Sequence, residues 1–426
     1  MRRRGLVSRI STAALAIAAA TAIVGTPTGA IAQKVPADLT VLPPVPTDYT
    51  PKKTPWGDWD FRATYTIENL PATRILFQRP KPYGNRVWVN DAEFAKRLEA
   101  AKRSDASFGD TPGIGTRGTQ GLADWVQRSS FGHRTSMLVD PVDGQLPPLT
   151  PLGEKLWKTG RSSWVPGQAF DWVDDFDSWD RCVSRGFPAS MYPFRYNNGI
   201  RVWQSPGYVV IELEMLGTRV IPLKGEHWPA PVEAWMGNSI GHWEGKTLVI
   251  ETTNIKSGDG ATHDPYKRAA SPLNMATQNV PAFNTIPMST KAKTIERLTM
   301  TDANTIVHEL TYSDPDTFTA PWTTRIEWNR DDKYQFFEYA CHEGNVQMRG
   351  YITSSRAERA AAALAKKEGR ALPKEVDSRE RFAVQFDYDP AAGDAPPGFG
   401  GPPPPPAPPP AATAAPPAVS TPPPKP

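Results

Sequence analysis

The clearest pattern in the chain is the alternation of apolar and polar side chains between residues 200 and 341. Apolar residues recur at every second position, which is the period of a β-strand with one buried face. The alternation predicts strands over 208–215, 219–223, 247–253, 294–300, 305–312, 322–328 and 334–341, with a shorter strand over 135–139. Short strands separated by turns are typical of a mainly β fold. We therefore expect an antiparallel barrel, lipocalin-like in shape, or a sandwich.

Helical patterns are fewer and lie outside this strand-rich region. The sequence predicts helices over 91–103, 151–158 and 355–367. Asn90, Thr150 and Ser355 stand at the expected N-cap positions, where a side-chain oxygen can accept a hydrogen bond from the first turn. Glu93 and Glu358 would complete capping boxes for the first and third of these helices.

These patterns divide the chain into successive segments. We expect a signal peptide over 1–32, an extended Pro-rich segment over 33–55, a wrap of loops, short helices and short strands over 56–194, the barrel or sandwich over 195–353, a helix and linker over 354–389, and a disordered Pro-rich tail over 390–426. The tail consists mainly of Pro, Ala and Gly, a composition that favours polyproline II and cannot form a core.

The first 32 residues have the features of a secretory signal. Basic residues from Arg2 to Arg9 precede an apolar run over 13–24, and Ala30-Ile31-Ala32 matches a cleavage site. The run is too short for a membrane anchor, and no later segment reads as a membrane span. The sequence RRGLV also fits the twin-arginine route, with general export as the alternative. We therefore expect a periplasmic or secreted protein that is cleaved after Ala32.

The composition and charge of the chain bear on which classes of molecule it could bind. The chain has 426 residues, of which 39% are hydrophobic, and this is enough to build a core. The formal net charge is +3, but residues 1–32 hold four arginines and no acid, so the mature chain carries about 3 − 4 = −1. This balance gives no support to a nucleic-acid partner.

Cys182 and Cys341 are the only cysteines in the chain. In an exported protein the usual state of such a pair is a disulfide, so we expect the two residues to be bonded. Two buried free thiols or two metal-binding thiolates are the alternatives. No CxxC motif and no histidine at a metal-binding spacing lies around Cys182, which argues against a zinc site.

Motifs for nucleotides, metals and hydrolysis are missing or out of context. A GxGxxG pattern over 113–118 follows a polar segment rather than a strand, so it does not indicate a nucleotide site. His227, His242, His263 and His308 do not pair at a tight metal-binding spacing. No GxSxG, HExxH or P-loop motif occurs. We therefore expect no cofactor and no metal, while a Ser–His–Asp arrangement stays open because it needs no local motif.

One histidine is a candidate for catalysis. His308 shares its predicted strand face with apolar residues, which places an imidazole inside the fold. Glu338 lies on the apolar face of the predicted strand 334–341, and a buried carboxylate needs a partner. Arg297 is one such partner and is also a candidate ligand contact. A histidine beside a carboxylate could act as a general base; a core histidine satisfied by a hydrogen bond is the structural alternative.

A second candidate site combines aromatic rings with a few polar groups. Trp235, His242 and Trp243 lie close together between glycines. Together with Trp322, these rings could line the mouth of a barrel and bind a small organic molecule, with His242, His308 and Glu338 as polar contacts. A hairpin whose tryptophans seal the core is the alternative.

Several segments recur together in a known family. They are RTSMLVDPVDGQLPPLT (134–150), RCVSRGFPASM (181–191), QSPGYVVIELEM (204–215), WMGNSIGHWEGKTLVIETTN (235–254), DPDTFTAPWT (314–323) and YACHEGN (339–345). In this order they resemble a large, uncharacterised family of exported bacterial proteins. The resemblance spans roughly residues 50–365 and implies export and a shared β-rich fold, but no reaction, ligand or catalytic residue. The chain departs from the family pattern in a longer segment over 257–287 and in its tail.

These observations lead to two hypotheses about function. The first is an exported protein that binds an apolar or aromatic small molecule in the mouth of a β-barrel. The second is a cofactor-independent lyase, isomerase or hydrolase that uses His308 and a carboxylate such as Glu338. A surface scaffold that contacts the cell envelope through its Pro-rich tail is a weaker third hypothesis.

Overall fold

The structure is a computed structural model that describes residues 35–67, 76–97, 133–159, 169–194, 197–257, 271–273, 286–343 and 345–371. The predicted signal peptide, the GxGxxG segment, His263 and the Pro-rich tail lie outside the described residues.

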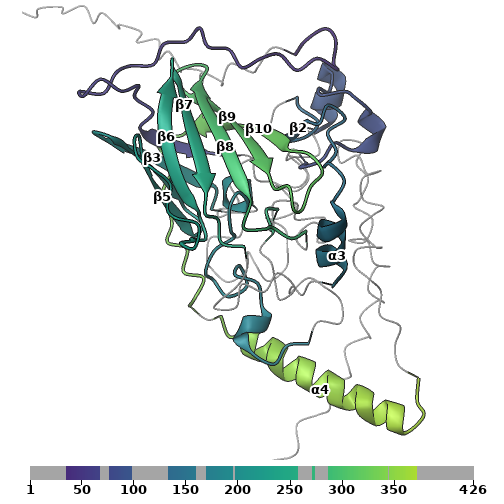
Figure 1. Ribbon diagram of the computed structural model, residues 1–426. Coiled ribbons are helices and arrows are strands. Elements are labelled where there is room, and N and C mark those ends of the chain that lie inside the picture. The colour runs from purple at the N-terminus through teal and green to yellow at the C-terminus, as the bar shows by residue number, and fades with distance from the viewer. Residues whose placement is uncertain are drawn as a thin grey trace, which may run out of the picture.

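The fold is a nearly closed, barrel-shaped antiparallel sheet (Figure 1). Its strands are β1 (Ala63–Thr66), β2 (Leu138–Asp140), β3 (Gly199–Ser205), β4 (Tyr208–Leu213), β5 (Gly217–Pro222), β6 (Asn238–Glu244), β7 (Thr247–Thr253), β8 (Lys293–Met300), β9 (Thr305–Ser313) and β10 (Trp322–Arg330). Neighbouring strands follow the order β5-β4-β3-β1-β10-β9-β8-β7-β6, and β2 pairs with β10 outside this path. The predicted mainly β fold and antiparallel barrel are thus confirmed.

Two meanders make up the barrel, and a strand from the N-terminal part joins them. β3 to β5 form one meander and β6 to β10 the other, while β1 pairs with both β3 and β10. β1 and β2 come from the segment that the sequence predicted to wrap the barrel. The strand predicted over 135–139 overlaps β2, whereas β1 was not predicted, because its four residues are too few for an alternation to be recognised.

The barrel closes where β5 meets β6, a boundary that we call the seam. These strands end the hydrogen-bonded order, so side chains rather than a backbone ladder join them. Gly241 of β6 makes this approach possible, because a Cβ at that position would lie 3.1 Å from the side chain of Ile221 on β5. Arg219 of β5 also crosses the seam to bond residues of the second meander.

The helices of the described residues lie outside the sheet. They are η1 (Lys81–Tyr83), α3 (Pro151–Thr159), η2 (Val173–Asp175), η3 (Ala189–Met191) and α4 (Gln347–Lys367). The Thr150 cap is confirmed by a 3.0 Å hydrogen bond from Gly153 N to its hydroxyl. A helical segment also begins at residue 91, with reciprocal capping bonds between Asn90 and Glu93.

The predicted start of the C-terminal helix at Ser355 is wrong. α4 begins at Gln347, so Ser355 lies inside the helix. Its hydroxyl accepts a 3.0 Å hydrogen bond from the backbone of Phe170, which is a tertiary contact rather than a cap. α4 projects away from the barrel at the bottom of Figure 1.

The predicted strand over 334–341 is also wrong. This stretch has no regular strand. β10, which precedes it, already pairs with β9 on one side and with β1 and β2 on the other, so no free edge remains beside it. Instead, Glu214 holds the stretch through its carboxylate, which accepts hydrogen bonds from the Phe337 backbone and the Tyr334 hydroxyl.

Apolar side chains fill the barrel and cover both of its ends. Phe61 packs edge-on against Trp243 at the end where β6 turns into β7. At the opposite end, the segment 185–194 inserts the buried side chains of Phe187 and Met191. A disulfide between Cys182 and Cys341 tethers this segment, which confirms the predicted bond. No helix in the described part of the chain is both long and apolar enough to cross a membrane.

Candidate functional site

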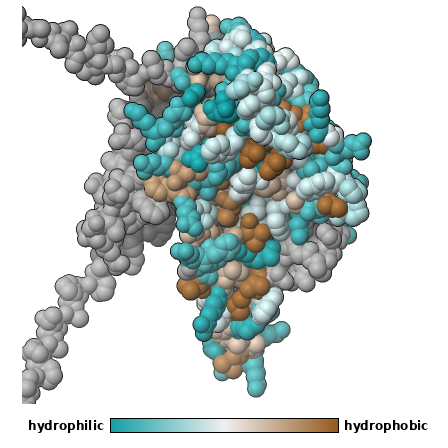
Figure 2. All heavy atoms as spheres, turned by 90° about the vertical axis from the view of Figure 1, so that its left-hand side faces the viewer, coloured by the Kyte–Doolittle hydropathy of each residue, from teal (hydrophilic) through white to brown (hydrophobic). Residues whose placement is uncertain are grey.

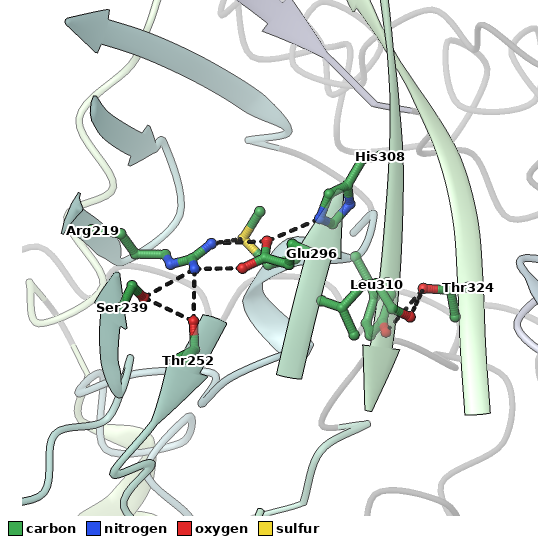
Figure 3. A network of polar contacts seen from close by, with 9 residues as sticks. Arg219, Ser239, Thr252, Glu296, His308, Leu310 and Thr324 are labelled. Atoms are coloured by element: carbon green, nitrogen blue, oxygen red, sulfur yellow. Dashed lines mark hydrogen bonds and ion pairs between the residues drawn. The ribbon is translucent and has the colours of Figure 1, made fainter. Parts of the chain in front are cut away.

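A group of charged and hydroxyl side chains lies inside the barrel, and we call it the interior cluster. It consists of Arg219 on β5, Ser239 on β6, Thr252 on β7, Glu296 on β8 and His308 on β9. Figure 3 shows Arg219 reaching across the interior to Glu296, with His308 on the far side of that carboxylate. All five side chains are buried.

Strand alternation explains why these residues point inward. Glu296 follows the inward Thr294 and precedes the inward Leu298, since successive side chains on a strand face opposite sides. Arg219 alternates in the same way with the buried Ile221. His308 stands between the buried Ile306 and Leu310 on β9 in the same alternation.

Arg219 and Glu296 form a two-pronged ion pair. Nη1 of the guanidinium donates to Glu296 Oε1 at 3.0 Å, and Nη2 donates to Oε2. Nη2 also donates to the hydroxyls of Ser239 and Thr252, each at 3.1 Å. The Phe187 ring lies 4.4 Å from the guanidinium carbon. This geometry fits the planar donor fork of arginine, and these partners offset part of the loss of water around two buried charges, while Arg219 Nε is buried without a partner among the described residues.

Glu296 is a carboxylate rather than a carboxylic acid. Burial alone would raise its pKa, but the Arg219 charge and the hydrogen bond from His308 outweigh burial and lower the pKa to about 2. A carboxylate can only accept hydrogen bonds. His308 Nε2, which lies 2.9 Å from Glu296 Oε1, must therefore carry the hydrogen and donate it.

Two polar atoms next to this pair have no hydrogen-bond partner. His308 Nδ1 and Trp328 Nε1 are both buried and unpaired among the described residues, and the two rings lie with their centroids 4.9 Å apart. The hydroxyl of Thr294, further along β8, is also buried and unpaired. Unpaired polar atoms are uncommon in protein interiors, and each one needs a physical explanation.

The expected partnership between His308 and Glu338 is not formed. His308 lies inside the barrel, as its alternation predicts. Glu338 is exposed, because it belongs to the stretch that does not join the sheet. Glu296 takes the place that the sequence suggested for Glu338. Arg297 points outward and pairs with Glu244 at 2.8 Å, so it does not reach His308.

The aromatic candidates do not gather in one pocket. Trp322 is buried and stacks on Tyr312 with 4.8 Å between the ring centroids. Trp243 packs against Phe61 at the end of the barrel. Trp235 lies outside, with the Lys256 ammonium 5.0 Å from its ring, and His242 is an exposed partner of Glu244. Trp243 and Trp322 therefore pack in the core and Trp235 does not, which agrees in part with the alternative in which the tryptophans seal the core.

A small hollow lies at the end of the barrel that the segment 185–194 covers. Its volume is about 10 Å³, which is close to the room needed by one water molecule. Polar groups from Arg185, Ser190 and Asn198 and apolar groups from Ile200 and Met215 line it. This hollow is too small for an organic ligand.

Four residues of the interior cluster, Arg219, Ser239, Thr252 and Glu296, were not among the expected site residues. β8 carries apolar residues on both faces, with Ile295 outside and Leu298 inside, so alternation alone does not choose its inner face. A usable signal was the strong apolar character of Leu298 and Met300, which places Glu296 on the same side. Within the described residues, no group of three or more metal-binding side chains is present.

Comparison of the chain with models of protein families, with curated proteins and with solved structures gave no match.

Proposed function

We propose that this chain is an exported binding protein that holds a small, mainly apolar or aromatic molecule with a hydroxyl group inside its barrel. The observation that supports the proposal is the buried pair of unpaired atoms, His308 Nδ1 and Trp328 Nε1. An unpaired buried polar atom costs about 1–3 kcal/mol. A bound group that bridges the two atoms would remove this cost.

The chemistry of the two atoms selects the bridging group. Because His308 donates through Nε2, its Nδ1 is an acceptor in the neutral ring, whereas Trp328 Nε1 is always a donor. A hydroxyl can donate to the first atom and accept from the second. The remainder of the guest would lie among apolar side chains, which suits a phenol or an aromatic alcohol better than a charged molecule.

The proposed route to this site is the seam between β5 and β6. His308 and Trp328 are fully buried, so a guest reaches them only when part of the barrel moves. The seam lacks a backbone ladder, and Arg219 crosses it through hydrogen bonds to Ser239 and Thr252. Opening and closing these side-chain bonds would need less rearrangement than separating two hydrogen-bonded strands.

Export is part of the same proposal. The disulfide between Cys182 and Cys341 supports an oxidising compartment, where such bonds persist. The signal peptide, the periplasmic or secreted location and the membership of the exported family stay predictions from the sequence. Contact with the cell envelope through the Pro-rich tail belongs with them.

Native mass spectrometry of the mature full chain, purified from the envelope of its own host, tests the proposal. We expect a bound mass that is released on denaturation. Tryptophan fluorescence titration with phenols and aromatic alcohols then measures affinity. His308→Phe and Trp328→Phe each remove one polar atom but keep a ring, and we expect roughly tenfold weaker binding for each.

The matched control is His242→Phe, which changes an exposed histidine on the outer face of β6 and should leave the affinity unchanged. The proposal fails if no bound mass appears and none of these compounds quenches the fluorescence. Equal affinity in wild type, His308→Phe and Trp328→Phe would also contradict it.

The second candidate function is a cofactor-independent lyase, isomerase or hydrolase. One observation favours it: a carboxylate orients the His308 ring so that Nδ1 is free to accept a proton, which is the arrangement of a general base. The full burial of His308 argues for binding as the first choice. Turnover of a bound compound that is lost in His308→Ala, while the fold survives, would reverse this order.

A further inference from the structure

We infer that the outer face of β3, β4 and β5 is the docking surface of this chain's own Pro-rich tail, residues 390–426. We call this surface the outer platform and define it by Trp203, Tyr208, Val210 and Val220. It lies on the outside of the barrel and is independent of the interior cluster. The inference combines the exposure of these side chains, their spacing and the composition of the tail.

The outer platform exposes large apolar side chains side by side. Trp203 is 52% exposed, Tyr208 47% and Val220 60%. Strand pairing places Trp203, Val210 and Val220 in one row across the three strands, because Trp203 pairs with Val210 and Val210 with Val220. Figure 2 views the molecule from the side that carries β3 and β5 and shows hydrophobic residues scattered among hydrophilic ones over this face.

The Trp203 ring is held in place before any partner binds. Its indole nitrogen donates to Glu212 Oε2 at 3.0 Å, and the Arg201 guanidinium lies 5.6 Å from its ring. Arg201 and Glu212 also approach each other to 3.7 Å, so these two charges beside the ring offset each other. A ring that is already fixed favours binding, because little side-chain freedom is lost when a partner docks.

The spacing of the rings matches a polyproline II helix. Trp203 and Tyr208 stand on neighbouring strands, two positions out of register, and such diagonal neighbours lie roughly 7–8 Å apart. A polyproline II helix has three residues per turn and advances about 9 Å per turn. Prolines one turn apart can therefore stack on the two rings, which is how aromatic surfaces hold Pro-rich segments.

The tail of this chain has the composition that such a surface accepts. Residues 401–410 read GPPPPPAPPP, and the segment 390–426 contains only Asp394 and Lys425 as charged side chains. Residues 372–389 separate it from the end of the described chain at Ala371, and when extended they span up to roughly 60 Å. Because tail and platform belong to one chain, their effective concentration is on the order of millimolar, so a weak contact suffices.

A spin label on the tail of the mature full chain tests the inference. Thr413→Cys supplies a single free thiol for the label, since Cys182 and Cys341 are bonded. In a chain with ¹⁵N-labelled tryptophan, we expect the Trp203 indole signal to disappear while the label is paramagnetic and to return when the label is reduced. The Trp172 signal, from a ring that is 65% exposed elsewhere, should persist.

Variants on both partners separate docking from chance proximity. Tyr208→Ser combined with Val220→Thr removes apolar surface but keeps Trp203 as the reporter, and the Trp203 signal should return. Replacement of Pro402 to Pro406 by serine should have the same effect. Val142→Thr, which changes a 66% exposed side chain away from the platform, should leave the signal absent.

Three results would overturn the inference. The first is a Trp203 signal that stays visible in the labelled chain. The second is its loss in the serine-substituted tail as well, since this would show a contact that does not depend on proline. The third is an equal loss of the signal in a mixture in which isotope and spin label are on separate molecules, because a second copy would then be the occupant.

Discussion

Two ion pairs, each with one member on β8, show how an inner or an outer position changes the role of the same chemical groups. Glu296 and Arg297 are neighbours on β8, and their side chains point to opposite sides of the sheet. Glu296 pairs with Arg219 inside the barrel, where both side chains are almost completely buried. Arg297 pairs with Glu244 outside, with 43% and 49% of the two side chains exposed.

The inner pair differs from the outer one in what surrounds it. Arg219 has hydroxyl partners on two further strands, whereas water can satisfy the groups of the outer pair. Two buried charges lose their hydration and depend on each other, so removing one leaves the other uncompensated. An exposed pair contributes little because water and salt screen it. The inner pair therefore depends on its partners far more than the outer pair does.

The largest expected effect is the loss of the inner pair. Arg219→Met leaves Glu296 buried without its cation, and we expect the free energy of unfolding to fall by about 3–5 kcal/mol. Urea denaturation of the mature chain measures this change. The matched control, Arg297→Met, should change the unfolding midpoint little. Similar midpoints for the two variants would show that the inner and outer pairs do not differ as proposed.

The second prediction concerns the stability of the fold at acid pH. The folded pKa of Glu296, about 2, lies below the ordinary value of 4.5, so its stabilising contribution is complete above about pH 4.5 and is lost as the pH falls toward 2. The difference corresponds to roughly 3 kcal/mol. Glu296→Gln should therefore flatten the dependence of unfolding free energy on pH in this window. Glu244→Gln should change the slope much less, because the hydrogen bond from Arg297 that lowers the pKa of Glu244 lies on the outer face, where water and salt screen the pair; a retained slope in Glu296→Gln would refute the assignment.

The third prediction tests the disulfide that holds the segment 185–194 at the end of the barrel. The disulfide closes a long loop, since its cysteines are 159 residues apart in sequence. Replacing both Cys182 and Cys341 by serine should lower the free energy of unfolding by about 2–4 kcal/mol. Denaturant titration measures the loss, and a thiol assay of denatured, unreduced wild type should find no free thiol. Unchanged stability in the double variant would mean that the segment 185–194 holds its place without the tether.

The smallest effect is expected from the tail. A chain that ends at Asp389 should melt within a few degrees of the full chain, because the Pro, Ala and Gly composition of the tail cannot form a core and the proposed contact is only with the outside of the barrel. Differential scanning calorimetry of the two chains measures this. A large drop in melting temperature would show that the tail stabilises the fold itself, and the contrast between inner and outer surfaces would need revision.

The sequence was informative wherever local pattern and burial agree. Alternation placed β4, β5, β7, β8, β9 and β10 close to their observed positions and put His308 on an inner face. Capping residues located α3 and the helical start at residue 91. Alternation misled at 334–341, where the same pattern occurs in a stretch that finds no free sheet edge.

What the sequence by itself determined is therefore the fold class, the disulfide and the inward position of His308, because each follows from local periodicity or from the presence of a single cysteine pair. Only the tertiary structure decided the partners of His308. Arg219 and Glu296 are 77 residues apart, and they meet because β5 closes against β6 after β1 has joined the two meanders. Strand alternation shows which side of its strand a residue faces, whereas the order of strands around the barrel decides what it faces there.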